Sequence, residues 1–233
     1  MKVVILCGGL GIRLSEETKR IPKPMVKIGN EPILVHILKI YYKFGFNDFI
    51  LALGYKSNVI KNFFEKKNFK FKVKTVFTGK HTNTGGRILK LKKLLVKENN
   101  FMVTYGDGVT NQNIKKLLNF HLEKKKIGTM TVVRPPARFG EVTLNGDLIN
   151  FFKEKPQISS GWINGGFFVF NKKIFKFIKK YSDMLEKAPL EGLVKKRQLV
   201  GYKHYGFWQC MDTLRDKHLL NKLIKNQKAP WMK

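Results

Sequence analysis

The sequence lacks any apolar run long enough to cross a membrane. Its first hydrophobic stretch, residues 3–7, is closed at once by Gly8 and Gly9, whereas a bilayer-spanning helix needs roughly 18 apolar residues. The stretch also lacks the longer apolar region and the cleavage site of a signal peptide. We therefore expect no membrane partner and a cytoplasmic location.

Cysteine is almost absent as well. The two cysteines, Cys7 and Cys210, are too few for a disulfide framework and do not have the spacing of metal ligands. We predict that both are small core residues.

Acidic residues are scarce: 16 Asp and Glu stand against 46 Lys and Arg, for a net charge of +30. Such an excess often indicates a nucleic-acid or anionic-surface partner. Here the lysines are spread over every predicted helix and loop, and the aromatic residues fall at core-like spacings. We interpret the charge as a solvated lysine surface that also attracts nucleoside triphosphates, and we predict no specific nucleic acid. A non-catalytic nucleotide or nucleic-acid binder remains the alternative; its RNA binding would persist at moderate salt.

Arginine is rare beside lysine, yet Arg13, Arg87 and Arg215 lie in the motifs described below, and Arg138 follows the Pro135-Pro136 pair. Such positions suit the planar bidentate fork that lysine cannot supply.

Strand and helix patterns alternate along the chain. Strands are expected at residues 3–7, 48–53, 69–77, 101–105, 129–133, 166–170 and 199–203, and helices at 32–44, 58–64, 86–96, 114–124, from 174, 190–195 and 214–226. Residues 141–144 and 148–153 flank a turn and read as a hairpin. The pattern predicts one α/β domain over residues 1–233, with a doubly wound, mostly parallel mixed sheet and a small β-hairpin region.

A glycine-rich segment, residues 7–14, follows the first predicted strand. Its glycines allow backbone N–H groups to approach an anion closely. It is not a dinucleotide fingerprint, because the third glycine would fall at Leu14, and no Gly-Lys-Ser/Thr of a P-loop follows. The segment is therefore either a phosphate-binding loop or a tight strand-to-helix turn.

Lys23 stands between Pro22 and Pro24, which restrict the backbone that carries its ammonium. Such a lysine can be a preorganised phosphate ligand. The alternative is one more lysine in a surface turn.

Two aspartates are candidate metal ligands. Asp107 lies between Gly106 and Gly108 at the carboxyl end of a predicted buried strand, where open α/β sheets bind ligands. Asp212 precedes the last predicted helix. Mg²⁺ commonly takes only one or two protein carboxylates, so this pair suffices. The alternatives are a turn-forming Asp107 and an N-cap at Asp212.

Seven segments resemble, in order, the motifs of sugar-1-phosphate nucleotidyltransferases, most closely those of the glucose-1-phosphate cytidylyltransferase branch. They are Gly8 to Leu14, Pro22-Lys23-Pro24-Met25, Thr84-Gly85-Gly86-Arg87, Tyr105-Gly106-Asp107-Gly108, Glu154-Lys155-Pro156, Trp162 to Phe168 and Met211 to Asp216. One departure stands out, because Ile12 replaces the threonine that the family usually has there.

The resemblance implies residue roles. Arg13 and Lys23 would act on the reacting phosphates, and Asp107 and Asp212 would hold Mg²⁺. Glu154, Lys155 and Asn164 would bind the sugar phosphate. The nucleotide would be bound by Leu6, Cys7, Gly8, Gly9, Leu10, Gly11, Ile12, Arg13, Lys23, Thr82, Arg87 and Gly106.

The resemblance also implies a reaction: transfer of a cytidylyl group from CTP to glucose 1-phosphate, giving CDP-glucose and pyrophosphate. It further implies a trimer or hexamer and a place in surface-polysaccharide (O-antigen, lipopolysaccharide) synthesis. UTP, dTTP or another sugar phosphate is the alternative. The Thr84-Gly85-Gly86-Arg87 segment favours the cytidylyl branch, because thymidylyltransferases carry a different signature there.

Overall fold

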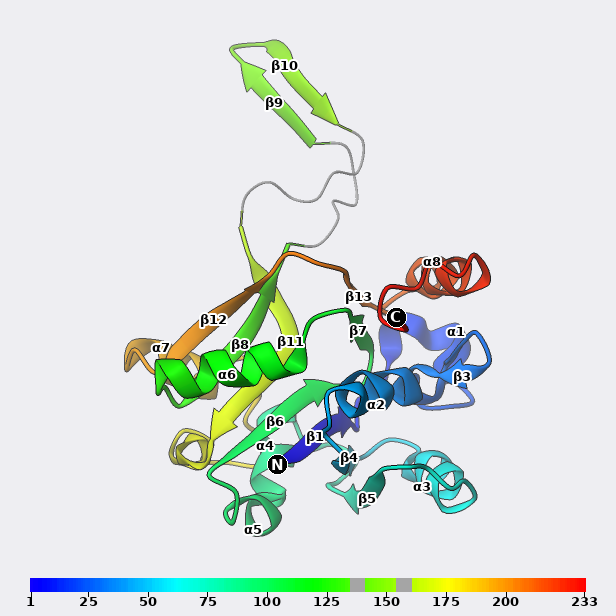
Figure 1. The fold of residues 1–233 in the computed structure, drawn as a ribbon, viewed down its shortest axis with the longest axis vertical. Helices are drawn as coiled ribbons and strands as arrows, with labels where there is room; N and C mark the ends of the chain where they lie inside the picture. Colours follow the sequence, from blue (N-terminus) through cyan, green and yellow to red (C-terminus); the bar gives the residue numbers. More distant parts are fainter. Residues whose placement is uncertain (135–140, 154–160) are drawn as a thin grey trace.

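A computed structural model of the chain describes residues 1–134, 141–153 and 161–233. Its centre is a seven-stranded sheet in the order β12-β8-β11-β6-β1-β4-β5 (Figure 1). Only β11 runs antiparallel to its neighbours, β6 and β8, while the other pairs are parallel. The expected mostly parallel mixed sheet is thus confirmed. The strands are β1 (Lys2–Cys7), β4 (Asp48–Leu53), β5 (Lys72–Phe77), β6 (Asn100–Tyr105), β8 (Gly128–Val133), β11 (Ile163–Asn171) and β12 (Leu199–His204).

Helices cover both faces of this sheet because its central strands are apolar on both sides. In β1, Val3 and Ile5 pack into one core with α2 (Ile33–Lys43), α3 (Ser57–Glu65), α6 (Ile114–Lys124) and α8 (Leu214–Lys225). The intervening Val4 and Leu6 pack into a second core with α4 (Thr84–Lys90), α5 (Lys92–Leu95) and α7 (Ala188–Lys195). This two-residue alternation places β1 at the middle of the molecule.

Short elements join the main ones. Two of them, β7 (Gly108–Thr110) and β13 (Trp208–Cys210), pair antiparallel, with Cys210 opposite Gly108. The others are η1 (Ile12–Leu14), α1 (Ser15–Thr18), η2 (Lys23–Met25), β2 (Lys27–Ile28), β3 (Glu31–Pro32), β9 (Glu141–Asn145), β10 (Leu148–Lys153) and η3 (Lys172–Lys176). β9 and β10 form the expected hairpin, which extends away from the main sheet (Figure 1).

Three predicted elements differ from the structure. The helix expected over 86–96 is divided, because the Leu91 N–H bonds to the Ile88 carbonyl in a tight turn that closes α4. The strand expected from residue 69 begins at Lys72, since Phe69 and Phe71 stack on each other at 5.1 Å. The helix expected from residue 174 is the short 3₁₀ helix η3.

Within the described residues, no helix is both long enough and apolar enough to cross a membrane.

Candidate active site

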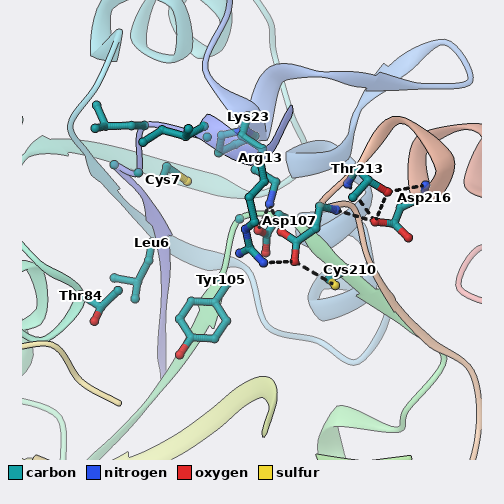
Figure 2. Close-up of a pocket in the computed structure, with 18 of the residues that line it drawn as sticks. Leu6, Cys7, Arg13, Lys23, Thr84, Tyr105, Asp107, Cys210, Thr213 and Asp216 are labelled. Carbon is teal, nitrogen blue, oxygen red and sulfur yellow. Dashed lines mark hydrogen bonds and ion pairs between the residues drawn. The ribbon is translucent and has the colours of Figure 1, made fainter. Parts of the chain in front are cut away.

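A cleft of about 1560 Å³ opens at the carboxyl ends of β1 and β6. Its walls come from the glycine-rich loop, from the turn after β6, from β11 and from the segment that enters α8 (Figure 2). This is the sheet edge at which open α/β folds bind ligands.

Lys23 joins two carboxylates in this cleft. Its Nζ lies 2.6 Å from Asp107 Oδ2 and 2.5 Å from Asp212 Oδ1. The second oxygen of Asp212 accepts from Arg13 at 2.7 Å. Figure 2 shows Arg13, Lys23 and Asp107 gathered at the centre of the site. The two aspartates, distant in sequence, therefore meet at the ammonium of Lys23, whereas the sequence analysis predicted that they would hold Mg²⁺.

Lys23 and Asp212 are largely shielded from water, so their charges interact strongly. The side chains of Lys23 and Asp212 are 11% and 12% exposed. Burial alone would lower the pKa of Lys23, but the two carboxylates outweigh it and the pKa is raised. Burial alone would raise the pKa of Asp212, but the hydrogen bond and charge of Lys23, with the charge of Arg13, lower it. Lys23 and Asp212 are therefore both charged at neutral pH.

The short ladder between β7 and β13 brings the aspartates together. The Met211 N–H donates to the carbonyl of Asp107 at 2.8 Å, immediately beside the ladder. The N-cap of α8 is Thr213, not Asp212, and it forms a capping box with Asp216. Asp212 is thus left free to point into the cleft.

Cys210 departs from the prediction of a core cysteine. Its thiol is only partly buried and donates to Asp212 Oδ2 at 3.6 Å. Burial, with the nearby carboxylates, raises its pKa to about 12. It therefore stays protonated beside the acidic pair. Cys7 is buried in the core, as predicted.

Arg87 supports the glycine-rich loop through a hydrogen bond to its backbone. Its guanidinium donates to the carbonyl oxygens of Gly8 at 2.9 Å and of Leu53 at 3.0 Å, and to Thr78 Oγ1 at 2.7 Å. Only 4% of Arg87 is exposed. An added Cβ at Gly8 would lie 2.0 Å from the guanidinium carbon, so only glycine fits. Arg87 thus shapes the loop through its backbone.

The remaining predicted nucleotide residues line the same cleft. Ile12 is 74% exposed at its mouth, and Gly11 adopts a φ of 69° that favours glycine. The Thr82 hydroxyl donates to the carbonyl of Thr78 at 2.6 Å, and the Gly106 N–H donates to the carbonyl of Leu6 at 3.2 Å. The loop, Thr82 and Gly106 therefore form one continuous wall.

On the far side of the cleft lies Asn164, whose Oδ1 accepts from the Gly166 N–H at 2.8 Å. A β-bulge interrupts the pairing of β11 with β8 between Asn164 and Phe168, and bulges re-aim side chains near sites. The other two predicted sugar-phosphate residues, Glu154 and Lys155, lie outside the described residues.

Among the cleft residues that sequence reasoning missed are three joined by hydrogen bonds. The Tyr105 hydroxyl donates to Glu186 Oε1, and the Thr84 hydroxyl donates to Glu186 Oε2 at 2.6 Å. Tyr105 and Thr84 stood inside recognised motifs, but no motif surrounds Glu186. Its position depends on the loop before α7, which the sequence pattern did not describe.

The acidic pair fits a hard divalent cation. Carboxylate oxygens are the ligands that Mg²⁺ prefers, and it fills its other positions with water and phosphate oxygens. Lys23 already places one positive charge between the two aspartates. The described part of the chain holds no group of three or more His, Cys, Asp or Glu side chains suited to a metal, so this pair would rely on ligands from substrate.

A doubly wound sheet with a glycine-rich loop and paired carboxylates at its carboxyl edge defines a nucleotide-binding α/β protein. The chain matches the family model for nucleotidyl transferases over residues 2–209. It is 41% identical to the glucose-1-phosphate cytidylyltransferase of Salmonella typhimurium, over 99% of this chain and 98% of that protein. The chain therefore belongs to the nucleotidyl transferase family, whose members generally use a divalent metal.

Two further comparisons mark the breadth of this family. The chain is 31% identical to the mannose-1-phosphate guanyltransferase of Saccharomyces cerevisiae, over 97% of this chain and 67% of that protein. HddC from Yersinia pseudotuberculosis superposes with a TM-score of 0.75 at 27% identity, over 96% of this chain and 99% of HddC.

Proposed function

We propose that this chain transfers the cytidylyl group of CTP to glucose 1-phosphate, forming CDP-glucose and pyrophosphate. One observation carries the proposal: Lys23, Arg13 and two aspartates converge beside the glycine-rich loop. The full-length similarity to a glucose-1-phosphate cytidylyltransferase supports the choice of substrates.

The chemistry suits a site without a nucleophile of its own. A phosphate monoester oxygen of glucose 1-phosphate is already anionic near pH 7, so it can attack the α-phosphorus of CTP without a strong base. A P–O bond forms, the bond to the β-phosphate breaks in line, and pyrophosphate leaves with its electron pair. The chain would contribute positioning and positive charge, with the loop amides, Arg13 and Lys23 turned toward the bound triphosphate.

We propose that Asp107 and Asp212 hold Mg²⁺. When bound, Mg²⁺ supplies charge that offsets the negative phosphates. Lys23 bonds to the same two carboxylates and competes for them. Once released from them, its ammonium can turn toward the phosphates. Lys23 therefore has two alternative partners within one site.

We propose that Asn164 binds the sugar side, together with Glu154 and Lys155. Leu6 to Arg13, Thr82 and Gly106 would surround the nucleotide, with Arg87 supporting the loop from beneath. We also propose a cytoplasmic enzyme that assembles as a trimer or hexamer, which light scattering of the purified protein measures directly.

The decisive experiment measures pyrophosphate release with CTP, UTP, dTTP, ATP and GTP, each with glucose 1-phosphate and with mannose 1-phosphate. We expect CTP with glucose 1-phosphate to give the highest kcat/KM. GTP with mannose 1-phosphate is included because of the yeast relative. A clear preference for any other pair would refute the proposed specificity. The absence of turnover with every pair would refute the reaction.

A further inference from the structure

Tyr105 and Glu186 form a pair in the cleft that the proposed phosphate chemistry does not use. Tyr105 ends β6, and its hydroxyl donates to Glu186 Oε1. The other carboxylate oxygen accepts from Thr84 Oγ1 at 2.6 Å. Tyr105 and Glu186 are both half-buried and both line the cleft. Hydrogen bonds to both oxygens hold the carboxylate in one position.

The loop that carries Glu186 packs closely against the Thr84-Gly85-Gly86 segment. A Cβ at Gly86 would lie 1.9 Å from the Tyr181 carbonyl oxygen, and one at Gly85 would lie 2.8 Å from that of Asp183. The Gly86 N–H also donates to the Asp183 carbonyl at 3.1 Å. Both glycines are therefore required for the loop over residues 181–186 to lie against α4, and this contact carries Glu186 to the cleft.

Another glycine, Gly166, leaves the space that the Tyr105 ring occupies. Gly166 has a φ of 77°, and a Cβ there would lie 2.5 Å from Tyr105 Cδ2. The ring packs edge-on against Phe168 at 5.9 Å. Two separate glycine segments thus position the Tyr105–Glu186 pair: Gly85 and Gly86 on the Glu186 side, and Gly166 on the Tyr105 side.

These hydrogen bonds determine which atoms of this wall can donate to a ligand and which can accept from it. Tyr105 has one hydroxyl hydrogen and donates it to Glu186, so its oxygen can only accept from the cleft. The Gly166 N–H orients the Asn164 amide, and one N–H of its Nδ2 donates to the Tyr105 oxygen at 3.4 Å. Burial, reinforced by Glu186, raises the pKa of Tyr105 and keeps the phenol protonated.

This arrangement of donors and acceptors favours one class of ligand. A phosphate has only acceptors and would be repelled by the Glu186 carboxylate. A neutral hydroxyl group can donate to the remaining lone pair of the Tyr105 oxygen and accept from the second N–H of Asn164 Nδ2. Tyr105 and Asn164 lie on β6 and β11, on the side of β1 away from β4. The hydroxyl-bearing part of the sugar phosphate therefore fits this wall.

We propose that Tyr105 binds a hydroxyl group of the hexosyl unit through its phenolic oxygen, and that Glu186 is the positioning residue that fixes this oxygen as an acceptor. The inference rests on the proposed function and adds two residues to its sugar side. It also gives the Thr84-Gly85-Gly86 segment a role, because its glycines hold the loop that carries Glu186.

Steady-state kinetics of single variants test the inference. Tyr105→Phe removes one oxygen, and the KM for glucose 1-phosphate should rise about threefold to tenfold, with kcat and the KM for CTP nearly unchanged. Glu186→Ala should raise the same KM, whereas Glu186→Gln keeps an oxygen that accepts from Tyr105 and should restore it. The double variant Tyr105→Phe/Glu186→Ala should be no worse than Tyr105→Phe. Tyr181→Phe and Glu191→Ala, both exposed, are the matched controls.

Deoxy analogues of glucose 1-phosphate identify the contact. The wild-type enzyme should discriminate against one of the 2-, 3-, 4- and 6-deoxy analogues, and Tyr105→Phe should lose that discrimination. A rise in the KM for CTP instead would assign the pair to the nucleotide and overturn the inference. Equal discrimination in both enzymes would overturn it too.

Calorimetric titration with glucose 1-phosphate repeats the comparison without turnover. Kd should weaken by the same factor in Tyr105→Phe and Glu186→Ala. A wild-type protein that releases no pyrophosphate contradicts the proposed function. Wild-type turnover with an unchanged KM and Kd in both variants contradicts this inference alone.

Discussion

The ammonium of Lys23 lies 2.5 Å from the carboxylate of Asp212, where a bound cation is also expected. The same ammonium bonds to Asp107 at 2.6 Å. A single lysine thus bonds to both acids before substrate arrives, and Arg13 supplies the second positive charge at Asp212. Lysine and metal then compete for the same oxygens, which gives a measurable consequence.

Lys23→Met should separate metal binding from catalysis. The variant removes the competing ammonium, so the affinity for Mn²⁺ or Mg²⁺ should rise about tenfold, the value of one charged hydrogen bond. Turnover should fall at the same time, because Lys23 no longer reaches the phosphates. Calorimetric titration with metal measures the first effect, with Lys61→Met as an exposed control. An unchanged metal affinity would contradict the competition.

Asp107→Asn and Asp212→Asn should each lower kcat by about 10²–10³-fold, as expected for loss of one preorganised charged group. The amide keeps the size of the side chain, so the circular dichroism spectrum should be unchanged. Asp147→Asn in the hairpin turn is the control. A variant that turns over at the wild-type rate would exclude its carboxylate from the metal site.

Gly86→Ala should destabilise the protein by about 1–3 kcal/mol, because the new methyl group meets a carbonyl oxygen. In an ordinary helix the same change stabilises by about 1 kcal/mol. Thermal unfolding measures the difference. Gly9→Ala is the matched control: its Cβ would meet nothing within 4 Å, and its stability should stay within about 0.5 kcal/mol of wild type. Equal stability of both variants would mean that the loop over residues 181–186 can move away from the added methyl group without cost.

Acid should destabilise the fold through His121. Burial lowers its pKa from 6.5 to about 4, and its ring nitrogens meet Thr129 at 2.9 Å and Asn100 at 3.3 Å. Between those values the unfolded chain binds a proton that the folded chain does not. Its contribution is complete above pH 6.5 and falls by up to about 3 kcal/mol as the pH drops to 4. Urea unfolding across this range measures the slope, which His121→Gln should reduce. An identical slope in the variant would assign the acid sensitivity elsewhere.

Ile12→Thr restores a hydroxyl at the mouth of the cleft, where Ile12 is 74% exposed. One hydrogen bond to a phosphate should raise kcat/KM about threefold to tenfold. Ile12→Val keeps the branched shape without the hydroxyl and should leave the rate unchanged. A similar gain in both variants would attribute the effect to size and not to hydrogen bonding.

The hydrophobic periodicity and the apolar composition of the strands were sufficient to predict the sheet, because β1, β4 and β6 are short apolar runs followed by glycine or a turn. They were insufficient where tertiary packing decides the outcome. The ladder between β7 and β13 has only three residues on each strand, too few for a pattern to reveal, yet it brings Asp107 to Asp212. The loop carrying Glu186 is ordered by contacts with Gly85 and Gly86 that are distant in sequence.

Arg87 illustrates a different difficulty. Its motif indicated a residue near the nucleotide, and it does line the cleft. The sequence could not indicate that its guanidinium is committed to the backbone oxygens of Gly8, Leu53 and Gly79. A motif fixes which residue is present, whereas its bonding partners depend on three chain segments meeting.

The strand β13 follows all seven strands of the main sheet in the chain, and Asp212 follows β13. During synthesis the sheet, the glycine-rich loop and Lys23 can all assemble while Asp107 still lacks its acidic companion. A product cut short before residue 208 would keep the residues of all seven strands but would lack Asp212 and the packing of α8 on the first core. Turnover therefore requires synthesis to continue at least through Asp212.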